Sequence, residues 1–517
     1  MQPSFGARQW AGVFLGPVLF VAAGLGLRAT GLNSAACWAA ATVFLMATWW
    51  ITEPLPLWVT ACLPLVLFPA FGSASFKDVA LQYFDPVNFL FLGGMMIAAC
   101  MEQWGLHRRI ALGIVARIGS SPRRIVLGFM LATGFITLWI SNTAAALMMF
   151  PIGMAVLQKF EEQHDPQDPL LRRFGMALML GIAYAASIGG IGTKIGTGTN
   201  FVFVKQAAQV MTREVTFLTW LKIGLPIVVV AIPVVWLYLV RVVARLPNEE
   251  FPGGRQAIHD ALVKLGRMKR GEVAALIAFL SAAFLWTFRQ DIDLGAFRVP
   301  GWGGLIPWSW SEVIGRPLTA LPKVLADLLG PRGADSVVAM IIGGTLLLVP
   351  LQLKPLRFAL DARRVGSIGW DMLALLGGGF AMAQGIQSSG LSGAIAGLLK
   401  GLGHMNPFLV MLVVCLVTTA ISEVASNTAT ASMLLPLLAV SAEHLGQPPA
   451  PLMFAATLAA SFGFMLPAGT PPNAIVYSSG YIPVTQMARS GLAVDLFGAA
   501  LIGTVCYFVA PWALGIR

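Results

Sequence analysis

The chain of 517 residues has little charge, since Asp, Glu, Lys and Arg make up only 11% of it. Hydrophobic residues make up 57%, and the mean hydropathy is +0.78. Soluble domains carry roughly 25% charged residues, so this composition excludes an ordinary soluble protein. About ten to twelve apolar segments approach the ~20 residues that a spanning helix needs, and they are too long for barrel strands. We therefore expect an all-α polytopic membrane protein.

Cysteine and histidine are also scarce, with five of each. The cysteines lie in apolar runs, are odd in number and show no metal or disulfide spacing, so we interpret them as packing residues. The histidines fall in polar stretches without an HExxH pattern. A GxxxxGK(S/T) loop is missing too, so ATP does not drive the chain directly. We expect no cofactor, and we disfavour a membrane enzyme, which would need an acid–base pair, an activated nucleophile or a metal cluster.

The net charge of +11 has a topological explanation. The densest basic stretches are "HRRIALGIVARIGSSPRR" from His107 and "KLGRMKRGE" from Lys264. Cytoplasmic loops of membrane proteins collect Lys and Arg. These stretches therefore predict cytoplasmic loops and give little reason to expect nucleic acid as a partner. Compact loops and the lack of a glycosylated ectodomain favour a multi-pass protein of a bacterial inner membrane.

The sequence contains an internal duplication, which is the signature to seek first. The triplet Ser-Asn-Thr occurs twice in apolar surroundings, once in each half of the chain. A Gly-Gly pair precedes each triplet, and a Gly-Thr turn follows each one, at nearly constant spacing. In order, the paired features are Gly93-Gly94 and Gly377-Gly378, Ser141-Asn142-Thr143 and Ser426-Asn427-Thr428, and Gly196-Thr197 and Gly469-Thr470.

Each repeat is expected to contain a Gly-Gly segment, a helix broken at the triplet and a helix broken at the Gly-Thr turn. The Gly-Gly segments are short and could form re-entrant hairpins, which are tolerated where protein or a water-filled cavity covers them. At each break, free carbonyls can coordinate Na⁺, and free amides at a positive helix end can hold a carboxylate. Interrupted helices in corresponding positions of two repeats predict a transporter's midplane binding site.

The duplication and the polar stretches divide the chain into five parts. A cytoplasmic linker is predicted between the halves, and an interfacial insert is predicted from its tryptophans Trp302, Trp308 and Trp310. The parts are scaffold helices at 1–83, a first repeat at 84–240, the linker at 241–271, second-half scaffold helices at 272–369 with the insert at 289–335, and a second repeat at 370–517.

Several motifs resemble one known family. "SNTA" occurs twice, "GTPPNA" once from Gly469, and "TEPLP" once from Thr52. Together they resemble the divalent anion/sodium symporter family, the INDY-like dicarboxylate and citrate transporters, over almost the whole chain except the insert. The resemblance implies an inverted-repeat fold of about eleven spans, with two re-entrant hairpins and discontinuous helices at the triplets. It also implies a homodimer and an elevator-type transport domain that moves against a scaffold.

The resemblance also implies roles for particular residues. Substrate carboxylates would be bound by Ser141, Asn142, Thr143, Thr197, Ser426, Asn427, Thr428, Thr470 and Pro471. Sodium would bind at two sites, one formed by Thr137, Ser141, Asn142 and Gly196, the other by Ser422, Ala425, Asn427 and Gly469.

The first Gly-Thr turn departs from the family pattern. It lacks the two prolines of the second turn, and Lys194 stands two residues before Gly196. An ionisable residue at membrane depth suggests a function. Lys194 could snorkel to an interface, contact an anionic substrate or a carboxylate partner, or stand in for a sodium ion and weaken coupling. Glu423 is expected to hold a helix break by accepting from free amides, because a carboxylate facing an anionic substrate would repel it.

The sequence therefore predicts a secondary transporter of small divalent anions, most favourably C4-dicarboxylates, coupled to Na⁺. Lys194 and the altered turn keep a sodium-independent dicarboxylate exchanger open as an alternative. A sulfate or tricarboxylate transporter on the same fold is another, because the triplets do not set the distance between carboxylates. An anion channel would need a continuous polar pore, which two half-sites do not provide.

Overall fold

The computed structural model describes residues 6–119, 121–162, 168–211, 214–249, 252–289, 291–293, 298–302, 334–366, 368–394, 406–442 and 448–516. These residues are mostly helical, as expected of a polytopic membrane protein. The helices of the first half are α1 (Ala7–Gly26), η1 (Leu27–Thr30), α2 (Ser34–Thr52), α3 (Leu57–Ala61), α4 (Leu63–Ala70), α5 (Phe76–Tyr83), α6 (Pro86–Trp104), α7 (Leu106–Ile118), α8 (Pro122–Thr137), α9 (Asn142–Glu161), α10 (Pro169–Gly190), α11 (Gly198–Val210), α12 (Phe217–Tyr238) and the π-helical turn η2 (Leu239–Val243).

The second half follows with a similar succession and two short β-hairpins. Its helices are α13 (Pro252–Leu265), α14 (Arg270–Thr287), α17 (Ala334–Leu348), α18 (Ala362–Gly366), α19 (Trp370–Ser388), α21 (Pro407–Ser422), α22 (Asn427–Ser441), α23 (Pro449–Ala459), α24 (Pro471–Tyr477), α25 (Val484–Phe508) and α26 (Ala510–Ala513). Strands β1 (Ile292–Asp293) and β2 (Arg298–Val299) pair antiparallel, as do β3 (Pro350–Leu353) and β4 (Leu356–Phe358).

Eight helical stretches among the described residues are long and apolar enough to cross a membrane, and five shorter apolar helices accompany them. The predicted linker contains the polar helix α13, which packs on α7 and α9. Most of the predicted insert, including Trp308 and Trp310, lies outside the described residues. Its described parts are residues 289, 291–293, 298–302 and 334–335, which include the antiparallel pair β1–β2 and the start of α17. The indole of Trp302 donates to the Leu285 carbonyl (2.7 Å).

The expectation of re-entrant hairpins at the Gly-Gly segments is wrong. Each segment lies within a single helix of 19 residues, α6 or α19. The glycines serve close packing: a Cβ on Gly93 would lie 2.4 Å from the Ala339 backbone of α17. A Cβ on Gly378 would lie 2.3 Å from the Ala61 carbonyl. Because glycine has no side chain, such pairs allow the backbone of a neighbouring segment to approach closely. The sequence pattern alone did not distinguish this packing role from a turn.

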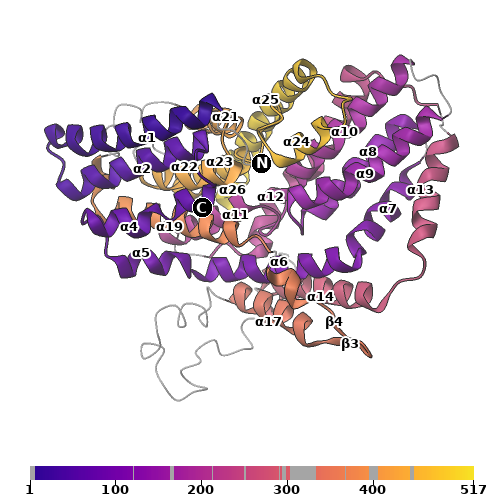
Figure 1. Ribbon diagram of the computed structural model, residues 1–517, viewed down its shortest axis with the longest axis horizontal. Helices are drawn as coiled ribbons and strands as arrows, with labels where there is room; N and C mark the ends of the chain where they lie inside the picture. Colours follow the sequence, from indigo (N-terminus) through magenta and orange to yellow (C-terminus); the bar gives the residue numbers. More distant parts are fainter. Residues whose placement is uncertain are drawn as a thin grey trace.

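The hairpins lie instead at the Ser-Asn-Thr triplets. Helix α8 ends at Thr137 and α9 begins at Asn142, so only the short segment 138–141 connects them. Both helices pack along α10, where Gly181 faces Met130 of α8 and Ile182 faces Gly153 of α9. The chain therefore turns back at the triplet, and α8, α9 and α10 run side by side at one end of the molecule (Figure 1). In the second half, α21 and α22 both pack along α23 in the same manner.

The Gly-Thr turns interrupt the helices that follow, as predicted. In the first half α10 ends at Gly190 and α11 begins at Gly198, and in the second α23 ends at Ala459 and α24 begins at Pro471. A buried asparagine braces each turn. Asn200 donates to the carbonyls of Gly190 (3.0 Å) and Thr193 (2.7 Å). Asn473 donates to the equivalent carbonyls of the second half, those of Gly463 and Leu466, both at 3.0 Å. This shared bracing supports the duplication.

Candidate functional site

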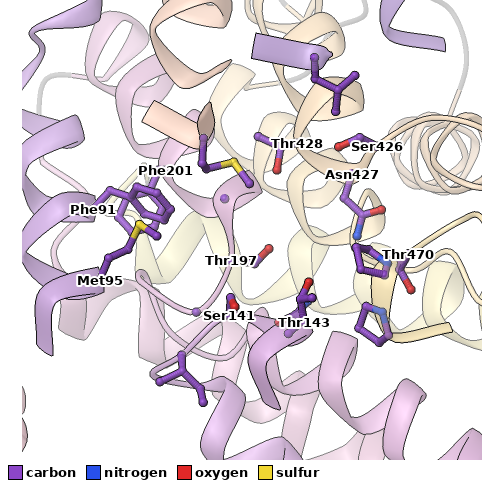
Figure 2. Close-up of a pocket in the computed structure, with 18 of the residues that line it drawn as sticks. Phe91, Met95, Ser141, Thr143, Thr197, Phe201, Ser426, Asn427, Thr428 and Thr470 are labelled. Carbon is purple, nitrogen blue, oxygen red and sulfur yellow. The ribbon is translucent and has the colours of Figure 1, made fainter. Parts of the chain in front are cut away.

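All nine predicted substrate residues line one cavity of about 400 Å³. The polar side chains that line it, which we call the polar rim, come from both halves of the chain. Figure 2 shows Ser141, Thr143 and Thr197 on one side of the space, and Ser426, Asn427, Thr428 and Thr470 across it. The structure thus brings together residues that are far apart in the sequence. Their role in binding stays a prediction.

Helix N-termini converge on the cavity. Ser141, Thr197 and Ser426 are the N-cap residues of α9, α11 and α22, and Thr470 is the N-cap of the short α24. The first amides of a helix have no partner within it, and the helix dipole makes that end positive. Hydroxyl-bearing caps add further donors. The cavity is therefore surrounded by positive helix ends, which suits an anionic ligand.

A cluster of oxygens marks the predicted first sodium site. The carbonyls of Thr137 and Gly190, where α8 and α10 end, lie beside Gly196, since a Cβ there would be 2.8 Å and 2.3 Å from them. A Cβ on Gly190 would lie 2.3 Å from Oδ1 of Asn142. That Oδ1 atom is buried and has no hydrogen-bond partner among the described residues. Carbonyl and amide oxygens at two negative helix ends fit a sodium ion.

The predicted second sodium site is related but looser. The Ser422 hydroxyl lies within hydrogen-bond distance of the Ala460 carbonyl (2.5 Å) and of Oδ1 of Asn427 (2.8 Å), and its single proton can go to either. A Cβ on Gly469 would lie 3.0 Å from the nearest atom, Oε2 of Glu423. Thr137, Ser422 and Ala425 are buried and do not line the cavity, whereas the other predicted sodium ligands do. Both predicted sodium sites therefore border the cavity and extend behind it, at the helix breaks.

Glu423 holds the second Gly-Thr turn, which confirms the prediction that it binds free amides. Its two carboxylate oxygens accept from the amides of Met465 (2.8 Å) and Leu466 (3.0 Å). Asp495 of α25 accepts from the neighbouring amide of Phe464 (3.3 Å). Two buried carboxylates thus fix three successive amides of this turn.

Sequence reasoning missed the apolar wall of the cavity. Phe91, Gly94, Met95 and Ala98 of α6 line it, together with residues from other elements. Figure 2 places Phe91 and Met95 beside Phe201, away from the polar rim. The four α6 residues are spaced three and four apart, which puts them on one helix face. That spacing was a readable signal, but it does not distinguish a cavity wall from an ordinary packing face.

Lys194 does not line the cavity. Its side chain is 2% exposed, so the snorkelling interpretation is wrong. Its Nζ donates to Oδ2 of Asp335 on α17 at 2.8 Å, which confirms the interpretation of a carboxylate partner. The stand-in for a sodium ion stays a prediction.

Comparisons with known proteins agree with this architecture. A family model described as "Sodium:sulfate symporter transmembrane region" matches residues 8–513. A "Sodium-dependent dicarboxylate transporter SdcS" of Staphylococcus saprophyticus is 37% identical over 516 residues, covering 99% of this chain and 93% of that protein. The protein of the same name from Staphylococcus aureus is 37% identical over 518 residues, with the same coverage. The crystal structure of the Alcanivorax borkumensis YdaH transporter has a TM-score of 0.52 at 15% identity, covering 92% of this chain and 99% of that one.

Proposed function

Because this chain belongs to the divalent anion/sodium symporter family, and is a transporter rather than an enzyme, we propose that it carries C4-dicarboxylates across the membrane together with sodium. The relatives that are 37% identical are named sodium-dependent dicarboxylate transporters, which supports both parts of the proposal. The nine cavity residues would bind the substrate carboxylates, and the two oxygen clusters would bind sodium.

One observation carries the proposal: the described residues that line the cavity include neither Lys nor Arg nor His. A dicarboxylate brings two negative charges, and burying an unpaired charge is costly. Each helix N-terminus presents a partial positive charge that its own negative C-terminus balances, so the helices add no net charge. A sodium ion in each flanking oxygen cluster would supply the missing positive charge, so the binding of anion and cation would be mutually dependent.

The division of the cavity supports an elevator-type movement. The polar rim comes from the hairpins and interrupted helices, whereas the wall on α6 is apolar. Gly93 and Gly343 allow α6 and α17 to pack closely, and we propose these two helices as part of the fixed unit. A bound substrate could then travel with the polar elements along the apolar wall without breaking its own hydrogen bonds. The ion pair between Lys194 of the first turn and Asp335 of α17 joins the moving part to the fixed part, so it would have to break during this movement. We further propose a homodimer in the inner membrane, as the family resemblance implies.

Thermal unfolding of the purified protein tests the proposal. A ligand that binds only the folded state stabilises it by about 2.7 kcal/mol at a hundred times its Kd. We expect succinate, malate and fumarate to raise the unfolding midpoint in sodium buffer and to leave it unchanged in choline buffer. Sulfate and citrate, tested at the same concentrations, should have smaller effects.

Other outcomes would select the alternatives. Equal stabilisation in sodium and choline would contradict sodium coupling and favour the sodium-independent exchanger. Stabilisation by sulfate or citrate rather than by a dicarboxylate would contradict the substrate class and keep the transporter.

A further inference from the structure

A closed ring of four charged side chains, three of them buried and one partly buried, lies beside the first Gly-Thr turn. Lys194 is 2.8 Å from Asp335, Arg289 is 3.1 Å from Asp335 and 2.7 Å from Glu214, and Glu214 is 3.9 Å from Lys194. Three of the side chains are at most 4% exposed, and Glu214 is 16% exposed. Positive and negative groups alternate around the ring, so its net charge is zero.

The ring connects elements that are far apart in the sequence. Lys194 belongs to the turn between α10 and α11, and Glu214 to the segment between α11 and α12. Arg289 follows α14, and Asp335 lies in the first turn of α17. Asp335 is itself fixed, because its carbonyl accepts from Trp286 of α14 (3.1 Å) and the next residue, Ser336, donates to Pro86 of α6 (2.6 Å). One turn is thereby tied to three helices, α6, α14 and α17.

The turn that the ring holds carries the first oxygen cluster. Lys194 is separated by one residue from Gly196, which lies against the carbonyls of Thr137 and Gly190. The hydroxyl of the preceding residue, Thr193, donates to the Leu138 carbonyl at the end of α8. A displacement of the Lys194 backbone would therefore move the neighbouring residues of the turn and change the distances among the oxygens of the first cluster.

The second turn is anchored by different chemistry. When Asn200 is aligned with Asn473, the counterpart of Lys194 is Pro467, which has no charge. That turn is held instead by Glu423 and Asp495 through backbone amides. When the two triplets are aligned, the counterpart of Glu423 in the first half is Leu138, which has no carboxylate. The first turn is thus held by a positive side chain and the second by negative side chains. Lys194 therefore has a role that is specific to the first half.

We propose that Lys194, held by Asp335 within the ring, is a positioning residue for the first sodium site and sets its affinity. The inference rests on the proposed function, because it concerns the sodium ion that would be transported. The positive charge of Lys194 is balanced by the carboxylates of Asp335 and Glu214, and its side chain does not line the cavity. Lys194 therefore affects sodium binding through the position of the turn and not by occupying the sodium site. Separating the partners of a buried ion pair leaves uncompensated charges, so the pair favours the position of the turn at which Lys194 and Asp335 meet.

The test is the sodium dependence of ¹⁴C-labelled succinate uptake in proteoliposomes, with sodium-induced thermal stabilisation as a second readout. For Lys194→Met we expect the half-saturating sodium concentration to rise about tenfold in both readouts. The maximal rate at saturating sodium should stay within about twofold. Lys194→Arg, which keeps the charge, should recover most of the sodium affinity. The double variant Lys194→Met/Asp335→Asn restores a net charge of zero in the ring but lacks the Lys194–Asp335 ion pair. Its half-saturating sodium concentration should therefore equal that of Lys194→Met.

Arg109→Met is the matched control. Arg109 forms a partly buried ion pair with Glu272 at the opposite end of α14 (2.7 Å), and it does not contact the turn. It should lower stability but leave the half-saturating sodium concentration unchanged. An unchanged sodium response in Lys194→Met, or its recovery in the charge-balanced double variant, would overturn the inference while the proposed function stands. A wild-type protein that responds to sodium in neither readout would overturn both.

Discussion

Replacing Gly196 with alanine is expected to reduce sodium-driven uptake by about 100-fold. The new methyl group would lie 2.3 Å from the Gly190 carbonyl and 2.8 Å from the Thr137 carbonyl, so the backbone must move. Overpacking of this kind costs about 1–3 kcal/mol, and a 100-fold loss corresponds to about 2.7 kcal/mol. Since both carbonyls belong to the predicted first sodium site, the loss should appear mainly as weaker sodium activation. Uptake of labelled succinate against sodium concentration measures it.

Two other glycines provide matched comparisons. Gly469→Ala places its methyl group no closer than 3.0 Å to any atom, and the nearest is a side-chain oxygen of Glu423. We expect a loss of about tenfold or less, which is about 1.4 kcal/mol. Gly344→Ala in α17 meets open space and should leave uptake within about twofold, because alanine favours a helix by about 1 kcal/mol. Equal uptake by Gly196→Ala and Gly344→Ala would contradict the assignment of the first site.

Asn200→Leu is expected to destabilise the fold by about 1.5–4.5 kcal/mol. The Gly190 carbonyl loses its donor, at about 1–3 kcal/mol, and the Thr193 carbonyl loses one of two hydrogen bonds, at about 0.5–1.5 kcal/mol, because it also accepts from the Gly196 amide. Leucine keeps the branching and the number of heavy atoms, but its methyl groups are larger than the amide oxygen and nitrogen, so overpacking at this buried site adds to the loss. Asn473→Leu should have an effect of the same size, since its two hydrogen bonds repeat those of Asn200. The midpoint of thermal unfolding and the fraction of monodisperse protein after purification measure both variants.

Thr504→Val is the control for lost hydrogen bonds. Its hydroxyl is exposed and donates only to the Ala500 carbonyl of the same helix (2.7 Å), so its loss should stay within about 0.5 kcal/mol. If Asn200→Leu unfolded no more easily than Thr504→Val, the asparagine brace would not hold the turn. A large effect of Asn200→Leu without one of Asn473→Leu would contradict the equivalence of the two halves.

The duplicated motifs explain why so much of the candidate site could be predicted. Ser141, Thr197, Ser426 and Thr470 each precede a helix start, and caps of this kind have a local sequence signature. Because the same motifs occur in both halves, the sequence also indicated that the residues of the two halves form one site. All nine predicted substrate residues accordingly lie in one cavity.

Features that depend on distant contacts could not be predicted in the same way. The Gly-Gly pairs are packing surfaces because Ala339 and Ala61 happen to lie against Gly93 and Gly378. The partner of Lys194 stands 141 residues away at the start of α17, beyond any local pattern. The sequence therefore identified an unusual lysine and a carboxylate partner as one option, but it could not name Asp335.

The most direct test of sodium-coupled dicarboxylate transport is the uptake of ¹⁴C-labelled succinate into proteoliposomes under an inward sodium gradient, with an equal choline gradient as the comparison. The membrane potential should be clamped in both cases, so that only the sodium gradient differs. Sodium coupling predicts accumulation of succinate above equilibrium with the sodium gradient and none with the choline gradient. Equal accumulation in both buffers, or none in either while the protein remains folded, would contradict it.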